Sequence, residues 1–322
     1  MRVSKSEKAE AIAKLQEMCP PGSKVYCSLR HVSRSEAREA IMRIDAAEVA
    51  KVAAAAAFLP DGEAFRLSPP NAKTKALCKS RKLKPCEFYS LSILSGISCP
   101  GAKDCKAWAK VGPDGKRTIE RGQGCEFQCF AASDEACYDE TYKQREHNRA
   151  LILKYKHDTY ALAALLLRSI PSKARLIRVH IGGDFFCQSY LDAWVLVALS
   201  RPSLHVYAYT KSLHFVLALE ASAADLPANL ALVLSEGGMF DHLLAPLKAL
   251  GFRSARVVFS EAEAKAQGLE VDHTDDLAAF GKANFALLLH GTQPAGSKAS
   301  KAIRDMQQAG VKFGYVRNPG RK

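Results

Sequence analysis

The sequence predicts an α/β protein whose parallel strands form a partial or full βα barrel. Apolar, strand-like runs recur along the chain, and from the second onward they are separated by helical segments at a spacing of about 25 to 30 residues. The runs begin near Phe88, Leu176, Leu204, Leu230, Ala255, Phe285 and Val311. Strand and helix alternating at this period is typical of βα units in a parallel sheet. Seven possible strands fit a barrel better than a small doubly wound sheet.

The first part of the chain has a different pattern. Helices are expected over residues 4–18, 33–44 and 45–59, the last of them rich in alanine. Residues 60–71 contain Pro60 and the run Ser68-Pro-Pro-Asn71, which is typical of a loop and of a domain boundary. We therefore expect an N-terminal helical extension over residues 1–68, whose function cannot be read, and one barrel-like domain over residues 69–322.

Composition limits the function classes. The chain has 322 residues, 48% hydrophobic and 25% charged, as in ordinary soluble proteins. The N-terminus does not read as a signal peptide and no apolar run is long enough to span a bilayer, so we expect a cytoplasmic protein, without a membrane partner, whose thiols stay reduced. A net charge of +13 indicates a nucleic acid or an anionic substrate as partner. A solvated basic face is the alternative for the densest basic run, which comprises Lys73, Lys75, Lys79, Arg81, Lys82 and Lys84.

Four cysteines are concentrated in one stretch, which follows the first predicted strand over residues 88–94. They are Cys99 and Cys105, in a loop with Pro and Gly, and Cys125 and Cys129 about twenty residues further on. Residues 111–117, between the two pairs, are expected to form a polar hairpin or excursion. Such a density of thiols predicts a zinc site or an iron–sulfur cluster, with buried but unligated thiols as the alternative. Four thiolates would close a zinc site or saturate a cluster, whereas three would leave one iron open.

Polar residues follow several of the predicted strands, where the active sites of βα folds lie. Gly182 and Gly183 could let a ligand approach the backbone, and Asp184 could bind an ammonium or hydroxyl group. Lys211 is expected to face the mouth of the barrel as an anion-binding or catalytic cation. The other candidates are His180, for which a core histidine is the alternative, and Tyr209 and Ser235.

Two helices are expected between the cysteines and the second strand, over residues 133–155 and 158–169. On the first of them, we interpret Arg145, His147, Asn148 and Arg149 as a solvated face, with an inward orientation of His147 as the alternative.

Several motifs resemble a known family. Ser98-Cys99-Pro-Gly-Ala-Lys-Asp-Cys105, Cys129-Phe-Ala-Ala-Ser133, Gly183-Asp-Phe-Phe186 and Tyr207-Ala-Tyr-Thr-Lys-Ser212 are similar to bacteriophage proteins of the gene product eighty-eight family, over about residues 70 to 240. They are also distantly similar to radical S-adenosylmethionine (SAM) enzymes, which carry a three-cysteine loop after the first barrel strand. That resemblance implies a [4Fe-4S] cluster on Cys99, Cys105 and Cys129, and SAM bound by Gly182, Gly183 and Asp184. The chain departs from those enzymes in the long gap before Cys129, in Asp184 where they have Glu, and in Cys125, which could occupy the place of SAM.

These observations give two main functional hypotheses. The first is an iron–sulfur enzyme, SAM-dependent and acting on a nucleotide or nucleic acid, in which Gly182, Gly183, Asp184 and Ser235 contact the cofactor and Tyr209, Lys211 and His180 act on the substrate. The second is a non-enzymatic nucleic-acid-binding protein with structural zinc or a cluster on Cys99, Cys105, Cys125 and Cys129. A third, a host-interaction protein in which the metal only staples a loop, has less support.

Overall fold

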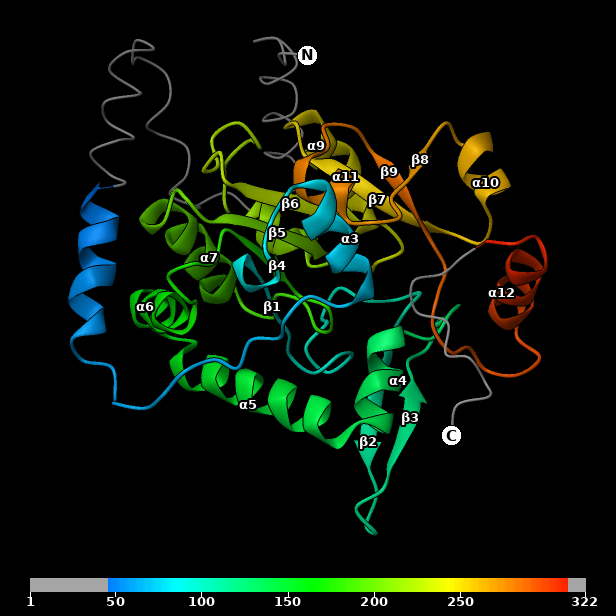
Figure 1. The fold of residues 1–322 in the computed structure, drawn as a ribbon, viewed down its shortest axis with the longest axis horizontal. Helices are drawn as coiled ribbons and strands as arrows, with labels where there is room; N and C mark the ends of the chain where they lie inside the picture. The colour runs from blue at the N-terminus through cyan, green and yellow to red at the C-terminus, as the bar shows by residue number, and fades with distance from the viewer. Residues whose placement is uncertain (1–45, 312–322) are drawn as a thin grey trace.

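A seven-stranded parallel sheet forms the centre of the protein (Figure 1). The structure is a computed structural model, and it describes residues 46–311. The strands pair in the order β1-β4-β5-β6-β7-β9-β8, and each pair is parallel. Their bounds are β1 Phe88–Leu91, β4 Leu176–Val179, β5 His205–Thr210, β6 Leu230–Ser235, β7 Arg253–Val258, β8 Glu270–Val271 and β9 Phe285–Leu288.

This topology confirms the parallel α/β class and six of the predicted strands. The short strand β8 was not predicted, because two residues are too few to show a strand period. The strand expected from Val311 lies outside the described residues. No pairing joins β1 to β8 among the described strands, so the described part of the chain shows an open sheet and not a closed barrel.

Helices pack against both faces of the sheet, which explains why the strands are largely apolar. On one face, α6 (Thr159–Ser169) and α7 (Gln188–Ser200) bury alternate strand residues such as Val179 and Val206. On the other face, α3 (Ala72–Ser80) and α11 (Asp276–Phe280) cover Tyr207 and Phe285. In a barrel this second face would line the interior. Here α3 and α11 occupy that position.

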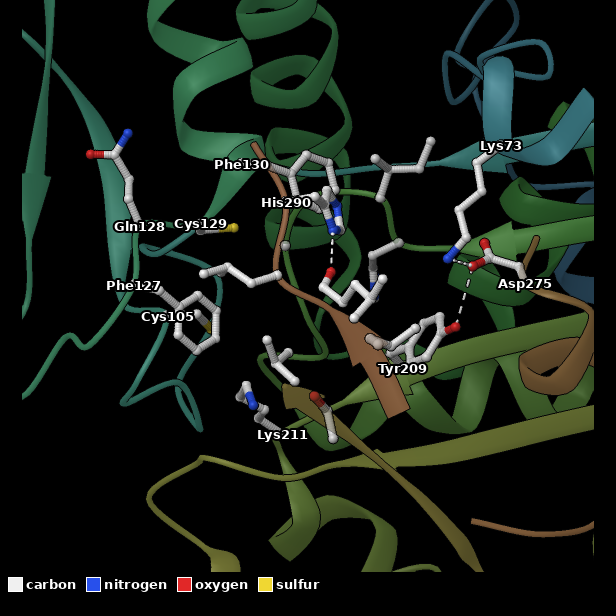
Figure 2. Close-up of a pocket in the computed structure, with 18 of the residues that line it drawn as sticks. Lys73, Cys105, Phe127, Gln128, Cys129, Phe130, Tyr209, Lys211, Asp275 and His290 are labelled. Carbon is white, nitrogen blue, oxygen red and sulfur yellow. Dashed lines mark hydrogen bonds and ion pairs between the residues drawn. The ribbon is translucent and has the colours of Figure 1, made fainter. Parts of the chain in front are cut away.

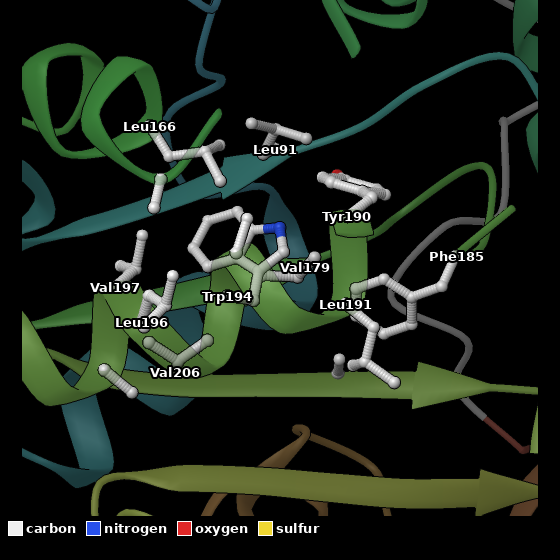
Figure 3. Close-up of a cluster of buried hydrophobic side chains, with 14 of the residues drawn as sticks. Leu91, Leu166, Val179, Phe185, Tyr190, Leu191, Trp194, Leu196, Val197 and Val206 are labelled. Carbon is white, nitrogen blue, oxygen red and sulfur yellow. The ribbon is translucent and has the colours of Figure 1, made fainter. Parts of the chain in front are cut away.

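The largest core cluster lies under α7. Trp194 and Tyr190 are fully buried and pack near Leu91 of β1, Leu166 of α6 and Val206 of β5 (Figure 3). Burying aromatic side chains of this size contributes several kcal/mol in total. The cluster therefore holds α7 rigidly on the sheet, and it also fixes the β4–α7 loop that carries Asp184.

The cysteine segment forms a subdomain beside the sheet. Its predicted excursion is an antiparallel hairpin of β2 (Ala107–Val111) and β3 (Arg117–Arg121), and α4 (Phe130–Cys137) packs against it (Figure 1). The single helix predicted over residues 133–155 is wrong. The chain leaves helical geometry at Tyr138, with φ −120° and ψ 114°, so α4 and α5 (Asp139–Tyr155) are separate helices. Neither helix boundary carries Pro or Gly, the residues that mark a break in a sequence.

The remaining helices are short, apart from α12. They are the 3₁₀ turns η2 (Pro85–Glu87) and η3 (Asp241–Leu243), and the α-helices α8 (Leu213–Leu217), α9 (Leu244–Ala249), α10 (Glu261–Ala266) and α12 (Lys298–Gln308). None of the helices in residues 46–311 is long and apolar enough to cross a membrane.

Residues 46–68 pack on the main core. Residues 46–56 are helical, in agreement with the expected alanine-rich helix, and Val52 and Phe65 are buried in the same cluster as α6 and α7. Asn148 of α5 binds this segment through Arg66, with its side-chain oxygen accepting from the backbone N–H and its amide donating to the carbonyl. Asn148 and Arg145 are both buried, so the prediction that they lie on a solvated face is wrong. The helices expected over 4–18 and 33–44 lie outside the described residues.

Candidate functional site

A cavity of about 180 Å³ opens at the carboxyl ends of the parallel strands (Figure 2). This is the edge at which ligands bind in open α/β sheets. From the strand ends the cavity is lined by Arg178, His180, Ile181, Gly183, Tyr209, Lys211, Ser235, Val257, Leu287, Leu288, Leu289 and His290. From outside the sheet it is lined by Lys73, Cys105, Phe127, Gln128, Cys129, Phe130 and Asp275. Residues from nine different segments of the chain therefore meet around one space.

Backbone hydrogen bonds dock the first cysteine loop on the ends of β5 and β6. The N–H of Asp104 donates to the carbonyl of Gly237, and that of Met239 donates to the carbonyl of Gly101. Gly101 lies so close to β5 that a Cβ placed on it would be 2.0 Å from the carbonyl oxygen of Lys211. Only glycine fits at such a distance, and the Gly in this loop therefore has a packing role.

The second cysteine pair returns to the first loop after the β2–β3 hairpin. The carbonyl of Asp104 accepts from the N–H groups of both Glu126 and Phe127. Gln128 and Gln293 then exchange two hydrogen bonds: the Gln128 N–H donates to the side chain of Gln293, which donates back to the Gln128 carbonyl. Cys105 and Cys129 are thereby brought to the same side of the cavity (Figure 2).

The thiols of Cys99, Cys105 and Cys129 lie in one electrostatic neighbourhood. Burial raises the pKa of each, to about 12 for Cys129 and well above the usual range for Cys99. The nearby thiols add to this: Cys129 and Cys105 raise the pKa of Cys99, and Cys105 raises that of Cys129. Burial and Cys105 also raise the pKa of Cys125, whose Sγ donates to the carbonyl of Phe127. In residues 46–311 no three His, Cys, Asp or Glu side chains are close enough together to hold a single metal ion.

A buried ion pair supports the strand end from which the cysteine loop departs. Glu135 of α4 accepts from Arg145 of α5 at 2.7 Å and from both the N–H and the hydroxyl of Ser95. Because burial of Glu135 raises its pKa, this carboxylate depends on its donors to stay ionised. Removing one partner of such a pair is costly. The pair thus links both helices to the chain four residues before Cys99.

The glycines and Asp184 after β4 have internal contacts that the sequence did not predict. The space that a Cβ would need at Gly182 is taken by Arg145, and at Gly183, with φ +90°, by Ile93. Asp184 is 5% exposed, and its carboxylate accepts from Phe185 N–H, Thr210 Oγ1 and Lys211 N–H at 2.6 to 2.8 Å. Of the expected cofactor residues in this loop, only Gly183 lines the cavity.

The cavity wall away from the cysteines is built around Asp275. Its side chain is fully buried and lies 2.6 Å from the Lys73 ammonium and 2.5 Å from the Arg178 guanidinium (Figure 2). The hydroxyls of Tyr207 and Tyr209 donate to it as well. These partners, Arg178 above all, hold the pKa of Asp275 well below its usual range in spite of its burial.

Three of the expected catalytic or binding residues line the cavity with defined partners. The His180 ring contacts the Tyr190 hydroxyl through Nε2 at 2.9 Å, and burial lowers its pKa to about 3, so it is neutral. Lys211 is buried and its ammonium donates to the backbone carbonyl of Glu236. The hydroxyl of Tyr209 donates a hydrogen bond to Asp275. Ser235, expected as a cofactor contact, also lies on the lining.

The structure adds residues to the site that sequence reasoning missed. Arg178 is a charge inside an otherwise apolar strand, which is a signal of function because arginine is seldom buried without a partner. Lys73 was placed in the basic run without a role of its own. Asp275 gave no signal, because its importance comes from a left-handed backbone conformation, φ +71°, that aims it back at the sheet. His290 follows a predicted strand, and its ring centroid lies 4.7 Å from that of Phe130 with the two rings tilted by 39°.

The fold and this site define an α/β protein with a parallel sheet and a cysteine-bordered cavity at its carboxyl edge. The sequence model of the family described as Gene product 88 matches residues 65–306, and the chain belongs to that family. Neither the curated proteins nor the solved structures yield a match to the chain.

Proposed function

We propose that the protein is an iron–sulfur enzyme whose cluster is held by Cys99, Cys105 and Cys129 and whose substrate binds in the adjoining cavity. The observation that carries the proposal is the convergence of these three thiols from two separate loops, beside a cavity at the carboxyl edge of a parallel sheet. Partial burial and the neighbouring thiols raise the pKa values of these cysteines, so they are costly to ionise unless a metal takes the place of the proton.

The donor set fits a cluster better than a single ion. Each thiolate of a cubane cluster binds its own iron, so the sulfur atoms do not have to converge on one point. A zinc site would need three or four ligands around one ion, and residues 46–311 contain no such group. A bound cluster would supply redox chemistry or an open iron as a Lewis acid. Lys211, which lowers the pKa of neighbouring Cys105, would favour the thiolate form at that ligand.

SAM is the part of the proposal with the least geometric support. Asp184 was expected to bind its amino group, but its carboxylate oxygens already accept three hydrogen bonds within the protein. The cavity is also smaller than the roughly 300–1,000 Å³ of sites for drug-sized ligands. If SAM binds the open iron, its amino group must find a partner other than Asp184.

Anaerobic purification tests the proposal. We expect the wild type to be coloured, with a broad visible absorption band and with iron and acid-labile sulfide in similar amounts. A Cys99→Ser/Cys129→Ser double variant should be colourless, whereas Cys137→Ser, at the exposed end of α4, should match the wild type. A colourless wild type that contains zinc would refute the cluster and favour a structural zinc site.

Nucleic-acid binding is a second candidate function, favoured by the exposed part of the basic run. Lys75, Lys79, Lys82 and Lys84 are exposed on α3 and the turn after it, although Arg81 is paired with Asp276 at 2.5 Å. Affinity for DNA or RNA should fall steeply as salt rises, because phosphate contacts release counterions. Replacing the four lysines by Gln should flatten that slope. Binding with an unchanged slope would leave them as solvated surface.

A further inference from the structure

We infer that the end of the cavity opposite the cysteines is a binding subsite for a small oxyanion, a carboxylate or phosphate group, held by Lys73 and Arg178 with Asp275 as their positioning residue. The inference rests on the proposed function in one respect, which is that it takes this cavity as the place of reaction. It deepens that function by naming the substrate class.

The net charge of the cavity lining favours an anionic ligand. The cavity lining contains three cations, Lys73, Arg178 and Lys211, and a single carboxylate, Asp275. With neutral thiols and histidines, the lining therefore carries a net charge of +2. Positive charge beside a partly enclosed cavity is poorly solvated, and it attracts an anion more strongly than the same charge in bulk water does.

Asp275 holds the two cations in place before any ligand binds. One buried carboxylate fixes both cations, since Lys73 binds Oδ1 and Arg178 binds Oδ2 of Asp275. Arg178 is further held by donating from Nε to the carbonyl of His180 and by lying over the Tyr209 ring, 5.4 Å from its centroid. Both cations have side chains only 11–13% exposed. Two cations that share one carboxylate leave a net positive charge at the cavity wall, and an oxyanion can accept charge-assisted hydrogen bonds from both.

Size and wall chemistry restrict the ligand. A space of about 180 Å³ holds a small molecule and not a whole nucleotide. Val257, Leu287, Leu288 and Leu289 supply an apolar wall. The matching ligand has one anionic group for Lys73 and Arg178 and a short apolar body that reaches toward Lys211 and the cysteines.

The subsite can be tested with inorganic phosphate and with acetate as probes, by calorimetric titration into the full chain at low ionic strength. We expect the wild type to bind at least one of the two, and the tighter probe identifies the class of anion. Lys73→Gln and Arg178→Gln should each weaken that binding by about tenfold or more, the loss expected for one charge-assisted hydrogen bond. Lys301→Gln, an exposed lysine on α12, should bind as the wild type does.

One further variant and one further measurement guard against a trivial loss through misfolding. Lys73→Arg keeps the charge and should retain binding within a few-fold, and circular dichroism should show folded protein for every variant compared. Wild-type affinity in both Gln variants, or no binding of either probe by the wild type, would overturn the inference. So would Lys73→Arg losing binding as fully as Lys73→Gln while staying folded.

The experiment also separates the two proposals. The titration is repeated on the Cys99→Ser/Cys129→Ser variant, which cannot hold the proposed cluster. Anion binding that survives there supports the subsite whether or not the wild type contains iron. An iron-containing wild type that binds neither anion would instead leave the proposed cluster standing and remove the subsite.

Discussion

The carboxylate of Asp184 accepts the backbone N–H of Lys211 at 2.8 Å, and this bond ties the loop after β4 to the end of β5. The same carboxylate accepts from Thr210, the residue before Lys211, and the backbone N–H of Asp184 donates to the carbonyl of Ser98. Asp184 thus joins three segments that border the cavity: the loop after β4, the end of β5 and the start of the cysteine loop. Its role in this structure is to hold the site together.

This position predicts that Asp184→Asn lowers stability. An amide has one oxygen and one NH₂ group, so one of the three donors would face an NH₂ group in place of an acceptor. The expected loss is about 1–3 kcal/mol in the free energy of unfolding, the cost of an unsatisfied buried group. Denaturant unfolding measures it, with the exposed Asp61→Asn as the control. Unchanged stability in Asp184→Asn would contradict the structural role of Asp184 and favour a role in ligand binding.

Gly101→Ala provides a second prediction about the same contact region. A Cβ at this position would meet the carbonyl of Lys211, a backbone atom that cannot rotate away. The loop carrying Cys99 and Cys105 should therefore shift, with a loss of about 1–3 kcal/mol in stability, as in other overpacked sites. Gly112→Ala in the β2–β3 hairpin meets only the end of the Asp114 side chain and a more distant carbonyl, and should cost little. Equal stability of the two variants would contradict the proposed docking of the loop.

The parallel sheet could be predicted because its signal is local. Runs such as Leu230–Ser235 are apolar along their length, as strands covered on both faces are, and loop residues follow them at regular intervals. What could not be read was which elements cover each face. Whether the sheet closes depends on α3 and α11, whose packing is a long-range property. The spacing of the strands along the sequence is the same in an open sheet and in a closed barrel.

The candidate site divides in the same way. Cys105, Cys129, Lys211 and Tyr209, which line the cavity, could be named as candidates because a dense group of cysteines and polar residues near a strand end are visible in sequence. Asp275 was not found, because its contact with Lys73 joins residues about two hundred positions apart through a single left-handed residue. The Gly182–Asp184 motif misled for a related reason. Close approach to a glycine can be made by a ligand or by the protein itself, and here Arg145 and Ile93 make it.

His180 predicts a pH dependence of stability. Burial lowers its pKa from 6.5 to about 3, so between these values the unfolded chain binds a proton that the folded chain does not. The free energy of unfolding should therefore fall as pH falls below 6.5, by about 1.4 kcal/mol for each pH unit from this residue alone. His180→Gln should flatten the slope between pH 6.5 and 4.5, while the exposed His157→Gln should keep it. A slope that is the same in all three proteins would show that His180 has the same pKa in the folded protein as in the unfolded chain.

The final prediction concerns the number of cysteine ligands. Cys105 and Cys129 raise the pKa of Cys99, and Cys105 raises that of Cys129, whereas the Sγ of Cys125 already donates to the Phe127 carbonyl at 3.3 Å. We therefore expect three protein ligands. Iron and sulfide should be lost from Cys99→Ser, Cys105→Ser and Cys129→Ser, and retained in Cys125→Ser.

Iron analysis of the four single variants after anaerobic reconstitution measures this, with the exposed Cys137→Ser as the control. Three ligands would leave one iron open toward a small molecule, and a fourth would saturate the cluster. Retention in Cys125→Ser therefore supports an enzyme whose open iron can act on a substrate. Loss of iron in Cys125→Ser, equal to that in the other three, would make Cys125 a ligand and leave the cluster a structural element of the cysteine loop.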